Sequence, residues 1–417
     1  MTLTQDDIND LETLCSAGLE DVWPLSPLQQ GLLFHALYDQ QTADVYTVQH
    51  VFDLQGPVDA TALKAAGQGL LGRHANLRAA FWHPRSGQPV AVIGREVTLP
   101  WREVDLSGLD VVGQEAALTR LLTDDRAQRF DPTHPPLLRF TLVRLENQHY
   151  QLVLTNHHIL LDGWSMPILI RELLVLYAQR GDPTRLGRVT PYRDYLAWLS
   201  TQDQAEAQQA WAQALTGLQQ PTLLVAPDAG RAPAIPEHIT IEVPDNLTTA
   251  LHDHTRRHGL TLNTVIQATW GLLLGRLTGT QDVVFGITVA GRPPQIPGIE
   301  TMIGLFINTL PVRIRWHPAE PLSTLLTRVQ DEQSQLIVHQ YLGLTDIQHL
   351  AGLGKLFDTL MVFENYPLDP GALNTPNTSV RITGVTGRDA THYPLSLIAV
   401  PGPGPRLRLR VDYRTDL

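Results

Sequence analysis

Apolar residues recur along this chain with two periodicities, and segments of the two kinds alternate. One is the three- and four-residue spacing of helices, and the other is the two-residue alternation of strands. The first clear helix begins at Ser26, which can act as N-cap, with Pro27 at the first helical position and Gln29 at capping-box spacing. The same spacing predicts helices over residues 59–73, 114–129, 165–178, 245–258 and 263–277, and another that ends near His339. Alternation predicts strands over residues 46–54, 77–82, 89–93, 137–145, 149–156, 238–243, 282–289 and 303–316, with three or more strands after His339.

The order of these elements predicts an α/β fold with two lobes. A chain of 417 residues is too long for one ordinary core, and both halves alternate helices with strands. The stretch over residues 181–236 mixes helical patches with Pro and Gly, as a connection would. We therefore expect an N-terminal lobe over residues 1–180, an inter-lobe connection over 181–236 and a C-terminal lobe over 237–417.

Composition narrows the classes of partner and compartment. The formal net charge of −11 argues against a nucleic-acid surface, which needs a clustered basic face. No apolar run is long enough to cross a bilayer, and the acidic N-terminus lacks the pattern of a signal peptide. A single cysteine, Cys15, cannot form an internal disulfide, which fits a reducing cytoplasm. We expect a cytoplasmic protein without membrane or nucleic-acid partners.

The most informative residues lie where an alternating strand ends and a capped helix begins, at His157, His158, Asp162, Gly163 and Ser165. Neighbouring side chains on a strand point to opposite faces, so only one of the two histidines can face a given cavity. Asp162 precedes a glycine on a sharp turn, where it can accept hydrogen bonds or pair with an arginine. The N–H of Gly163 lies near a helix start, which favours developing negative charge.

This arrangement suits acyl transfer without a covalent enzyme intermediate. An imidazole titrates near neutral pH and can accept a proton from an attacking amine or orient it. No nucleophilic serine or cysteine is evidently placed beside it, and no G-x-S-x-G elbow occurs. A buried histidine pair with a turn-capping aspartate is the plainer alternative. We expect no metal site, because the histidines are adjacent rather than four apart and no third ligand is evident.

Six further segments accompany the sequence HHILLDG at residues 157–163. They are SPLQQGLLFH at 26–35, RHANLR at 73–78, YRDYLAW at 192–198, IGLFINTLPVR at 303–313, HQ at 339–340, and RD at 388–389 followed by YPL at 393–395. In this order they resemble the motifs of nonribosomal peptide synthetase condensation domains, whose signature is HHxxxDG. The resemblance covers essentially the whole chain, and ordered matches are far more specific than one.

The resemblance implies two chloramphenicol-acetyltransferase-like lobes arranged in a V with a central tunnel. Donor and acceptor peptidyl carrier domains would insert their 4'-phosphopantetheine arms, and the acceptor amine would attack the donor thioester. No cofactor would be bound by the chain itself. An adjacent adenylation domain is a further expected partner, and the chain would be a monomeric unit of a multidomain synthetase. It ends where family members usually continue into another helix, which suggests a piece of a larger synthetase.

The same resemblance assigns roles within the signature and beyond it. His158 would be tied to catalysis together with Asp162 and Gly163, and His157 would be packed in the lobe. Asp162 would be paired with an arginine of the RHANLR segment, either Arg73, which we favour, or Arg78. Asn308 would line the tunnel, with a buried strand asparagine as the alternative.

Two segments that depart from the family motifs and one that matches them indicate which subtype of condensation domain this chain resembles. Residues 388–395 read RDATHYPL rather than RDxSRNPL, and residues 339–344 read HQYLGL rather than HQDxPFE. With SPLQQGLLFH, these variants suggest the subtype that takes a D-configured donor and an L-configured acceptor. Trp164 and Ser165 follow Gly163 where epimerisation domains have a run closer to VSWR, which favours condensation. An epimerisation domain and a non-catalytic recruitment domain of the same fold remain the alternatives.

Overall fold

A computed structural model describes residues 4, 7, 18–38, 44–84, 87–225, 236–365, 370–374, 379–402 and 404–415, so Cys15 lies outside the described residues. The chain forms two compact units. Unit 1 comprises Met1–Ser200, Arg292–Phe306 and Tyr366–Ala390, and unit 2 comprises Thr201–Gly291, Ile307–Asn365 and Thr391–Leu417. These boundaries differ from the predicted division at residues 180 and 236. Two segments from the later half of the chain pack into unit 1, which no local sequence pattern reveals.

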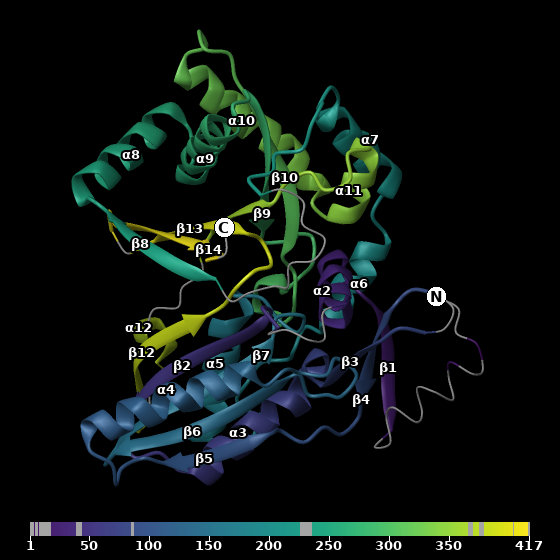
Figure 1. Ribbon diagram of the computed structural model, residues 1–417. Coiled ribbons are helices and arrows are strands. Elements are labelled where there is room, and N and C mark those ends of the chain that lie inside the picture. The colour runs from purple at the N-terminus through teal and green to yellow at the C-terminus, as the bar shows by residue number, and fades with distance from the viewer. Residues whose placement is uncertain are drawn as a thin grey trace. The chain divides into compact units, whose positions relative to one another are not determined.

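Unit 1 is built around a five-stranded sheet with the order β12-β2-β7-β6-β5 (Figure 1). Its neighbouring strands are antiparallel except for the parallel pair β5 and β6. The strands are β2 (Thr47–Gln55), β5 (Trp101–Asp105), β6 (Leu138–Glu146), β7 (His149–His157) and β12 (Arg381–Arg388). A smaller sheet has the order β1-β4-β3, with β1 (Leu19–Pro24), β3 (Ala79–Trp82) and β4 (Val90–Gly94). The helices are α2 (Pro27–Tyr38), α3 (Ala60–Arg73), α4 (Val111–Ala127), α5 (Ser165–Ala178), α6 (Tyr192–Ser200) and α12 (Pro370–Leu373).

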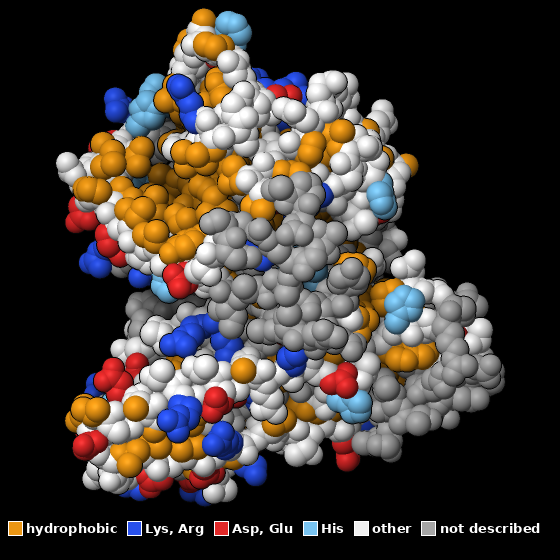
Figure 2. All heavy atoms as spheres, viewed as in Figure 1, with side chains coloured by type: hydrophobic (Ala, Val, Ile, Leu, Met, Phe, Trp, Pro, Cys, Tyr) orange, Lys and Arg blue, Asp and Glu red, His pale blue; other side chains and the backbone are white. Residues whose placement is uncertain are grey.

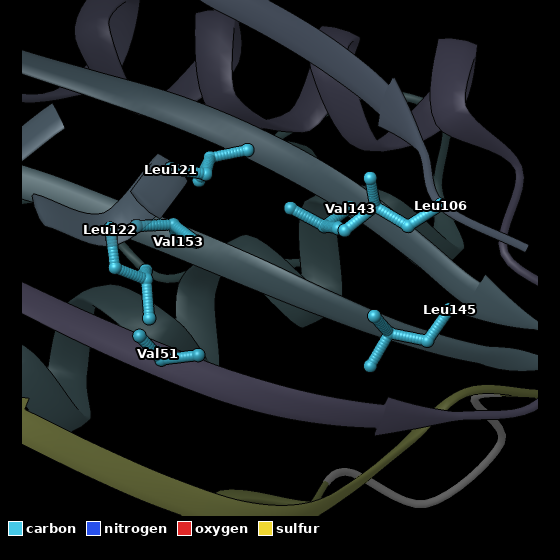
Figure 3. Close-up of a cluster of buried hydrophobic side chains, with 7 residues drawn as sticks. All are labelled: Val51, Leu106, Leu121, Leu122, Val143, Leu145 and Val153. Carbon is cyan, nitrogen blue, oxygen red and sulfur yellow. The ribbon is translucent and has the colours of Figure 1, made fainter. Parts of the chain in front are cut away.

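Helices cover both faces of the five-stranded sheet. On one face, α4 packs its leucines against valines of the sheet, and Figure 3 shows this cluster of Val51, Leu106, Leu121, Leu122, Val143, Leu145 and Val153. On the other face, α3 and α5 meet apolar residues that include Phe52, Leu54 and Leu152. Successive residues of β2 therefore alternate between α4 and the α3–α5 side, as the period of a strand requires.

Unit 2 contains a six-stranded sheet with the order β10-β9-β11-β13-β14-β8. Its strands are β8 (Glu237–Val243), β9 (Asp282–Val289), β10 (Asn308–Arg315), β11 (Thr359–Phe363), β13 (Leu395–Pro401) and β14 (Leu407–Tyr413). Its helices are α7 (Gln204–Leu215), α8 (Asp245–His258), α9 (Leu262–Thr278), α10 (Leu322–Leu336) and α11 (Leu344–Ala351). Ile239 and Ile241 of the edge strand β8 are about half exposed, and Figure 2 shows hydrophobic side chains gathered on this part of unit 2.

Local signals placed most of these elements correctly. The N-terminus of α2 has the predicted capping box: the Ser26 N–H donates to Oε1 of Gln29 at 3.0 Å, and the Gln29 N–H donates to Oγ of Ser26 at 3.4 Å. Gly259 ends α8 with a φ of 65°, a conformation that favours glycine. Helix α5, helix α8 and strand β9 have the predicted bounds.

The strand expected over residues 303–316 is wrong in its first part. Strand β10 begins only at Asn308, and residues 303–307 belong to no strand. The reason is that the backbone of this segment bonds to the turn at Asp162 instead of to a neighbouring strand. The Asp162 N–H donates to the Gly304 carbonyl at 3.0 Å, and the Phe306 N–H donates to Oδ2 of Asp162 at 3.1 Å. Strands β1 and β5 and helix α11 were not predicted. Among the described residues, no helix is both long and apolar enough to cross a membrane.

Candidate active site

The first histidine of the signature, His157, is the last residue of β7 and is completely buried. Its Nδ1 accepts a hydrogen bond from the Ile159 N–H at 3.1 Å, and its Nε2 lies 3.2 Å from Oδ2 of Asp44. Burial opposes the charge of Asp44, but its contact with the His157 imidazole and a hydrogen bond from the Tyr46 N–H at 2.9 Å hold the pKa of Asp44 below its usual value. His157 is thus fixed on both sides and cannot reach a substrate.

The second histidine, His158, is partly exposed. Its backbone N–H donates to the carbonyl of Tyr46 at 2.9 Å, which continues the pairing of β7 with β2 by one residue. Nδ1 of His158 is buried and makes no hydrogen bond within the described part of the chain. Burial lowers the pKa of His158 and His157 adds to this, while its own carbonyl, Asp389 and Asp162 oppose the shift. The imidazole is therefore neutral at pH 7 and can accept a hydrogen bond or a proton.

Asp162 is a buried carboxylate whose two oxygens are both occupied. Oδ1 accepts from the Ser165 N–H at 2.9 Å, from the Ser165 hydroxyl at 2.8 Å and from Nη2 of Arg292 at 3.1 Å. Oδ2 accepts from the Phe306 N–H at 3.1 Å. A carboxylate that is 1% exposed and holds four hydrogen bonds organises the turn rather than exchanging protons with a substrate.

The predicted pairing of Asp162 with Arg73 or Arg78 is wrong. Arg73, at the end of α3, pairs through Nε with Glu172 of α5 at 2.8 Å. Arg78 pairs through Nη2 with Glu20 at 2.6 Å, and its other nitrogens donate to nearby backbone carbonyls. Both arginines are satisfied by neighbours in their own part of the fold. The partner of Asp162 comes instead from a segment 130 residues later in the chain.

Ser165 is fully buried and ties the signature turn to Gly304. The Ser165 hydroxyl has two acceptors in reach, Oδ1 of Asp162 at 2.8 Å and the Gly304 carbonyl at 2.9 Å. Its oxygen accepts hydrogen bonds from the Gly304 N–H and from Nη2 of Arg292, at 3.0 Å each. A hydroxyl used in this way is no nucleophile. Gly163 and Trp164 are partly exposed in the turn before α5, and the Gly163 carbonyl accepts from the Met166 N–H at 3.3 Å.

The YRDYLAW segment secures the same region through its aromatic rings. Tyr192 donates its hydroxyl to the Leu305 carbonyl at 2.6 Å, and its ring meets Phe306 edge to face at a centroid distance of 5.2 Å. Tyr195 packs on the same phenylalanine at 4.8 Å. The guanidinium of Arg292 lies over the Phe306 ring at 4.0 Å, which adds a cation–π contact to its ion pair. Sequence reasoning missed Arg292, because a lone arginine after a strand carries no local signal.

Gly304 is the position where this packing leaves least room. A Cβ there would lie 2.2 Å from the ring of Tyr192. We expect Gly304→Ala to lower the free energy of unfolding by about 1–3 kcal/mol, because the ring must shift. Chemical denaturation measures this loss. Gly31→Ala in α2 is the matched control, since it faces open space and should raise stability by about 0.5–1 kcal/mol. Equal effects of the two substitutions would contradict this account.

Asn308 is buried at the start of β10 in unit 2. Its Nδ2 donates to the carbonyls of Gln340 and Leu342 at 2.8 and 2.9 Å, and its Oδ1 accepts from the Thr309 N–H at 2.9 Å. Within unit 2, Oε1 of Gln340 in turn accepts from the Gly291 N–H at 3.3 Å. Asn308 therefore joins two of the sequence motifs, which is the buried-asparagine alternative. That it also lines a tunnel stays a prediction.

Comparison with known proteins decides the family. A family model described as "Condensation domain" matches residues 19–417. The chain belongs to the condensation-domain family. A linear gramicidin synthase of Brevibacillus parabrevis is 37% identical over 94% of this chain, and bacitracin synthase 3 of Bacillus licheniformis is 34% identical over 97%. This condensation domain spans only 8% and 6% of those two proteins.

Solved structures support the same fold. The starter condensation domain of rhizomide synthetase matches with a TM-score of 0.78 at 20% identity, covering 96% of this chain and 90% of that one. The first condensation domain of the calcium-dependent antibiotic synthetase matches with a TM-score of 0.75 at 21% identity, covering 96% and 92%. The predicted α/β class with a chloramphenicol-acetyltransferase-like fold is confirmed. The chain is a nonribosomal peptide synthetase condensation domain, and such domains form amide bonds.

Proposed function

We propose that this domain forms an amide bond between two substrates carried as thioesters on phosphopantetheine arms. The α-amine of the acceptor aminoacyl thioester attacks the thioester carbonyl of the donor. A C–N bond forms and the donor C–S bond breaks, so the donor chain moves to the acceptor. The amine loses one proton, and the released thiolate of the donor arm takes up one. One observation carries this proposal: of the two adjacent imidazoles, one is fixed and buried and the other is neutral and partly exposed.

In this proposal His158 orients the attacking amine through a hydrogen bond and receives its proton. An α-amine with a pKa of about 8 is already partly neutral at pH 7, so positioning supplies much of the effect. Asp162 and Ser165 hold the loop that carries His158, through the contacts of Arg292 and Gly304. The N–H of Gly163 would face the oxygen of the donor carbonyl as negative charge develops there.

The finer assignments follow from the motif variants and from the relatives. We propose that the donor is D-configured and the acceptor L-configured, because RDATHYPL and HQYLGL depart from the usual motifs. The partners would be donor and acceptor peptidyl carrier domains and an adjacent adenylation domain. The relatives are large synthases of which the domain matches a small part, which supports this setting. The setting would be cytoplasmic.

Intact-protein mass spectrometry of the two carriers tests the proposal. The donor carrier is loaded with a peptidyl group and the acceptor carrier with an aminoacyl group, and both are mixed with the domain. We expect the acceptor carrier to gain the mass of the donor chain. An acceptor loaded with an N-acetylated aminoacyl group is the control and should gain nothing, because its nitrogen cannot attack. Absence of transfer with several well-loaded pairs would contradict the proposal and favour a recruitment domain.

The epimerisation alternative gives a different result in the same experiment. An epimerase needs one carrier only and exchanges the α-hydrogen of the bound aminoacyl group with solvent. We expect no deuterium uptake when the domain meets a single peptidyl carrier in D₂O. Deuterium uptake without transfer to a second carrier would favour epimerisation.

A further inference from the structure

Three titratable residues of unit 1 lie at one end of the five-stranded sheet: His50 is in β2, His158 directly follows β7, and Asp389 directly follows β12. His50 on β2 is opposite Leu154 of β7 and opposite Gly387 of β12. Residues opposite each other in antiparallel strands share a face, and so do residues two or four apart along a strand. His158 comes four residues after Leu154, and Asp389 comes two after Gly387. His50 therefore lies on the side of the sheet that α3 and α5 cover, and His158 and Asp389 lie just past the ends of the two strands that pair with β2.

His50 is an unusual residue for this apolar face. It is 9% exposed and stacks on Phe52 at a centroid distance of 6.2 Å. Opposite it stands a glycine, and a Cβ at position 387 would lie 3.5 Å from Cδ2 and 3.6 Å from Nε2 of the imidazole. Nδ1 of His50 is buried and makes no hydrogen bond within the described residues. A buried nitrogen without a hydrogen-bond partner lowers the stability of the fold, so we infer that His50 is kept for its function.

The charges around this face act on one another. Burial lowers the pKa of His50 to about 4, with Asp389 opposing and His158 adding to the shift. Asp389 also raises the pKa of His158, as Asp162 does, while His157 lowers it. His50 is therefore uncharged at neutral pH and does not compete for the charge of Asp389.

The charge of Asp389 also acts on an arginine of α4. Burial lowers the pKa of Arg126 on α4, and Asp389 opposes this shift while Arg388 adds to it. The half-buried Asp389 thus acts on an arginine as well as on the two histidines.

We propose that Asp389 and His50 are positioning residues for His158, with the Asp389 carboxylate favouring proton transfer to His158 and the neutral His50 completing the polar cluster. A carboxylate near an imidazole stabilises its protonated form, so His158 becomes a better acceptor for the proton of the attacking amine. Because His50 stays neutral, it does not weaken the effect of the Asp389 charge on His158. The inference rests on the role proposed above for His158.

NMR titration of the His158 imidazole tests the carboxylate directly, and His158→Asn assigns its signal. We expect Asp389→Asn to lower the pKa of His158 by about half a unit or more. The control is Asp53→Asn, which removes a carboxylate of β2 from the face opposite to His50 and should leave that pKa unchanged. An unchanged pKa of His158 in Asp389→Asn would overturn the proposal. This measurement needs no turnover, so it stands apart from the proposed function.

Single-turnover transfer between loaded carriers tests the link to the reaction. In Asp389→Asn the lower inflection of the pH profile should move to lower pH by the shift seen by NMR, because His158 loses its proton sooner as pH rises. The plateau rate should fall several-fold. His50→Gln should lower the plateau without moving the inflection, since His50 is already neutral. An unmoved inflection in Asp389→Asn would contradict the role proposed for Asp389. An unchanged plateau rate in His50→Gln would contradict the role proposed for His50.

Discussion

Replacing His158 with alanine should lower the rate of peptide transfer by about 10²–10⁴-fold, the usual contribution of a positioned acid–base group. The partly exposed imidazole is neutral at pH 7, because burial and His157 lower its pKa. Its alanine replacement removes the group that orients the amine and accepts its proton. The measurement is single-turnover transfer between a loaded donor and a loaded acceptor carrier, followed by intact mass spectrometry.

An exposed histidine of the same unit is the matched control for this experiment. The His134 side chain is 77% exposed and bonds to Asp131 and Thr133 in its own turn, so His134→Ala should leave the rate unchanged. The circular dichroism and the unfolding midpoint of both variants should match those of the wild type. A loss of less than tenfold in His158→Ala, with the fold intact, would reduce His158 to a structural residue.

Replacing Arg292 with methionine should lower the free energy of unfolding by about 3–5 kcal/mol, the cost of leaving one partner of a buried ion pair alone. The Arg292 and Asp162 side chains are 9% and 0% exposed, so water cannot solvate the carboxylate that remains. The variant also loses donors to the carbonyls of Ile299 and Met302, at 2.6 and 3.0 Å. Urea denaturation measures the loss.

Two further variants separate the ion pair from other effects of the substitution. Arg315→Met removes an exposed ion pair with Glu332 at 3.5 Å and should cost less than about 1 kcal/mol. The double variant of Arg292→Met with Asp162→Asn should recover part of the loss, because no unpaired charge stays buried. A loss in Arg292→Met no larger than in Arg315→Met would contradict the role given to Arg292.

Elements whose signals lie within a few residues were predictable from the sequence. The capping box of Ser26 and Gln29 fixed the start of α2, and Gly259 fixed the end of α8, because both effects act within one turn of helix. The alternating run over residues 303–316 was misleading for the opposite reason. Its first residues are apolar and buried like a strand, yet their backbone groups bond to a turn far away in the sequence.

The candidate site was predictable to the same extent. The signature placed both histidines, Asp162 and Ser165 at one strand end and helix start, and the structure has them there. The partner of Asp162 was not predictable, because an ion pair between residues 130 positions apart produces no recognisable pattern in the sequence. Arg73 and Arg78 were conspicuous through their motif, but carboxylates and carbonyls beside them in the fold already satisfy their charge.

The path of the chain limits how this domain can be exchanged between synthetases by recombination. A single crossover after Ser200 would join the first 200 residues of unit 1 to a foreign Arg292–Phe306 segment and a foreign β12. The folding of each hybrid would then depend on two features of the new parent: an arginine that pairs with Asp162, and a strand that pairs with β2. Parents that differ at these places should give hybrids that fail to fold even when each parent is sound. Crossovers outside residues 1–390 keep unit 1 from a single parent, and natural and engineered exchanges alike should favour them.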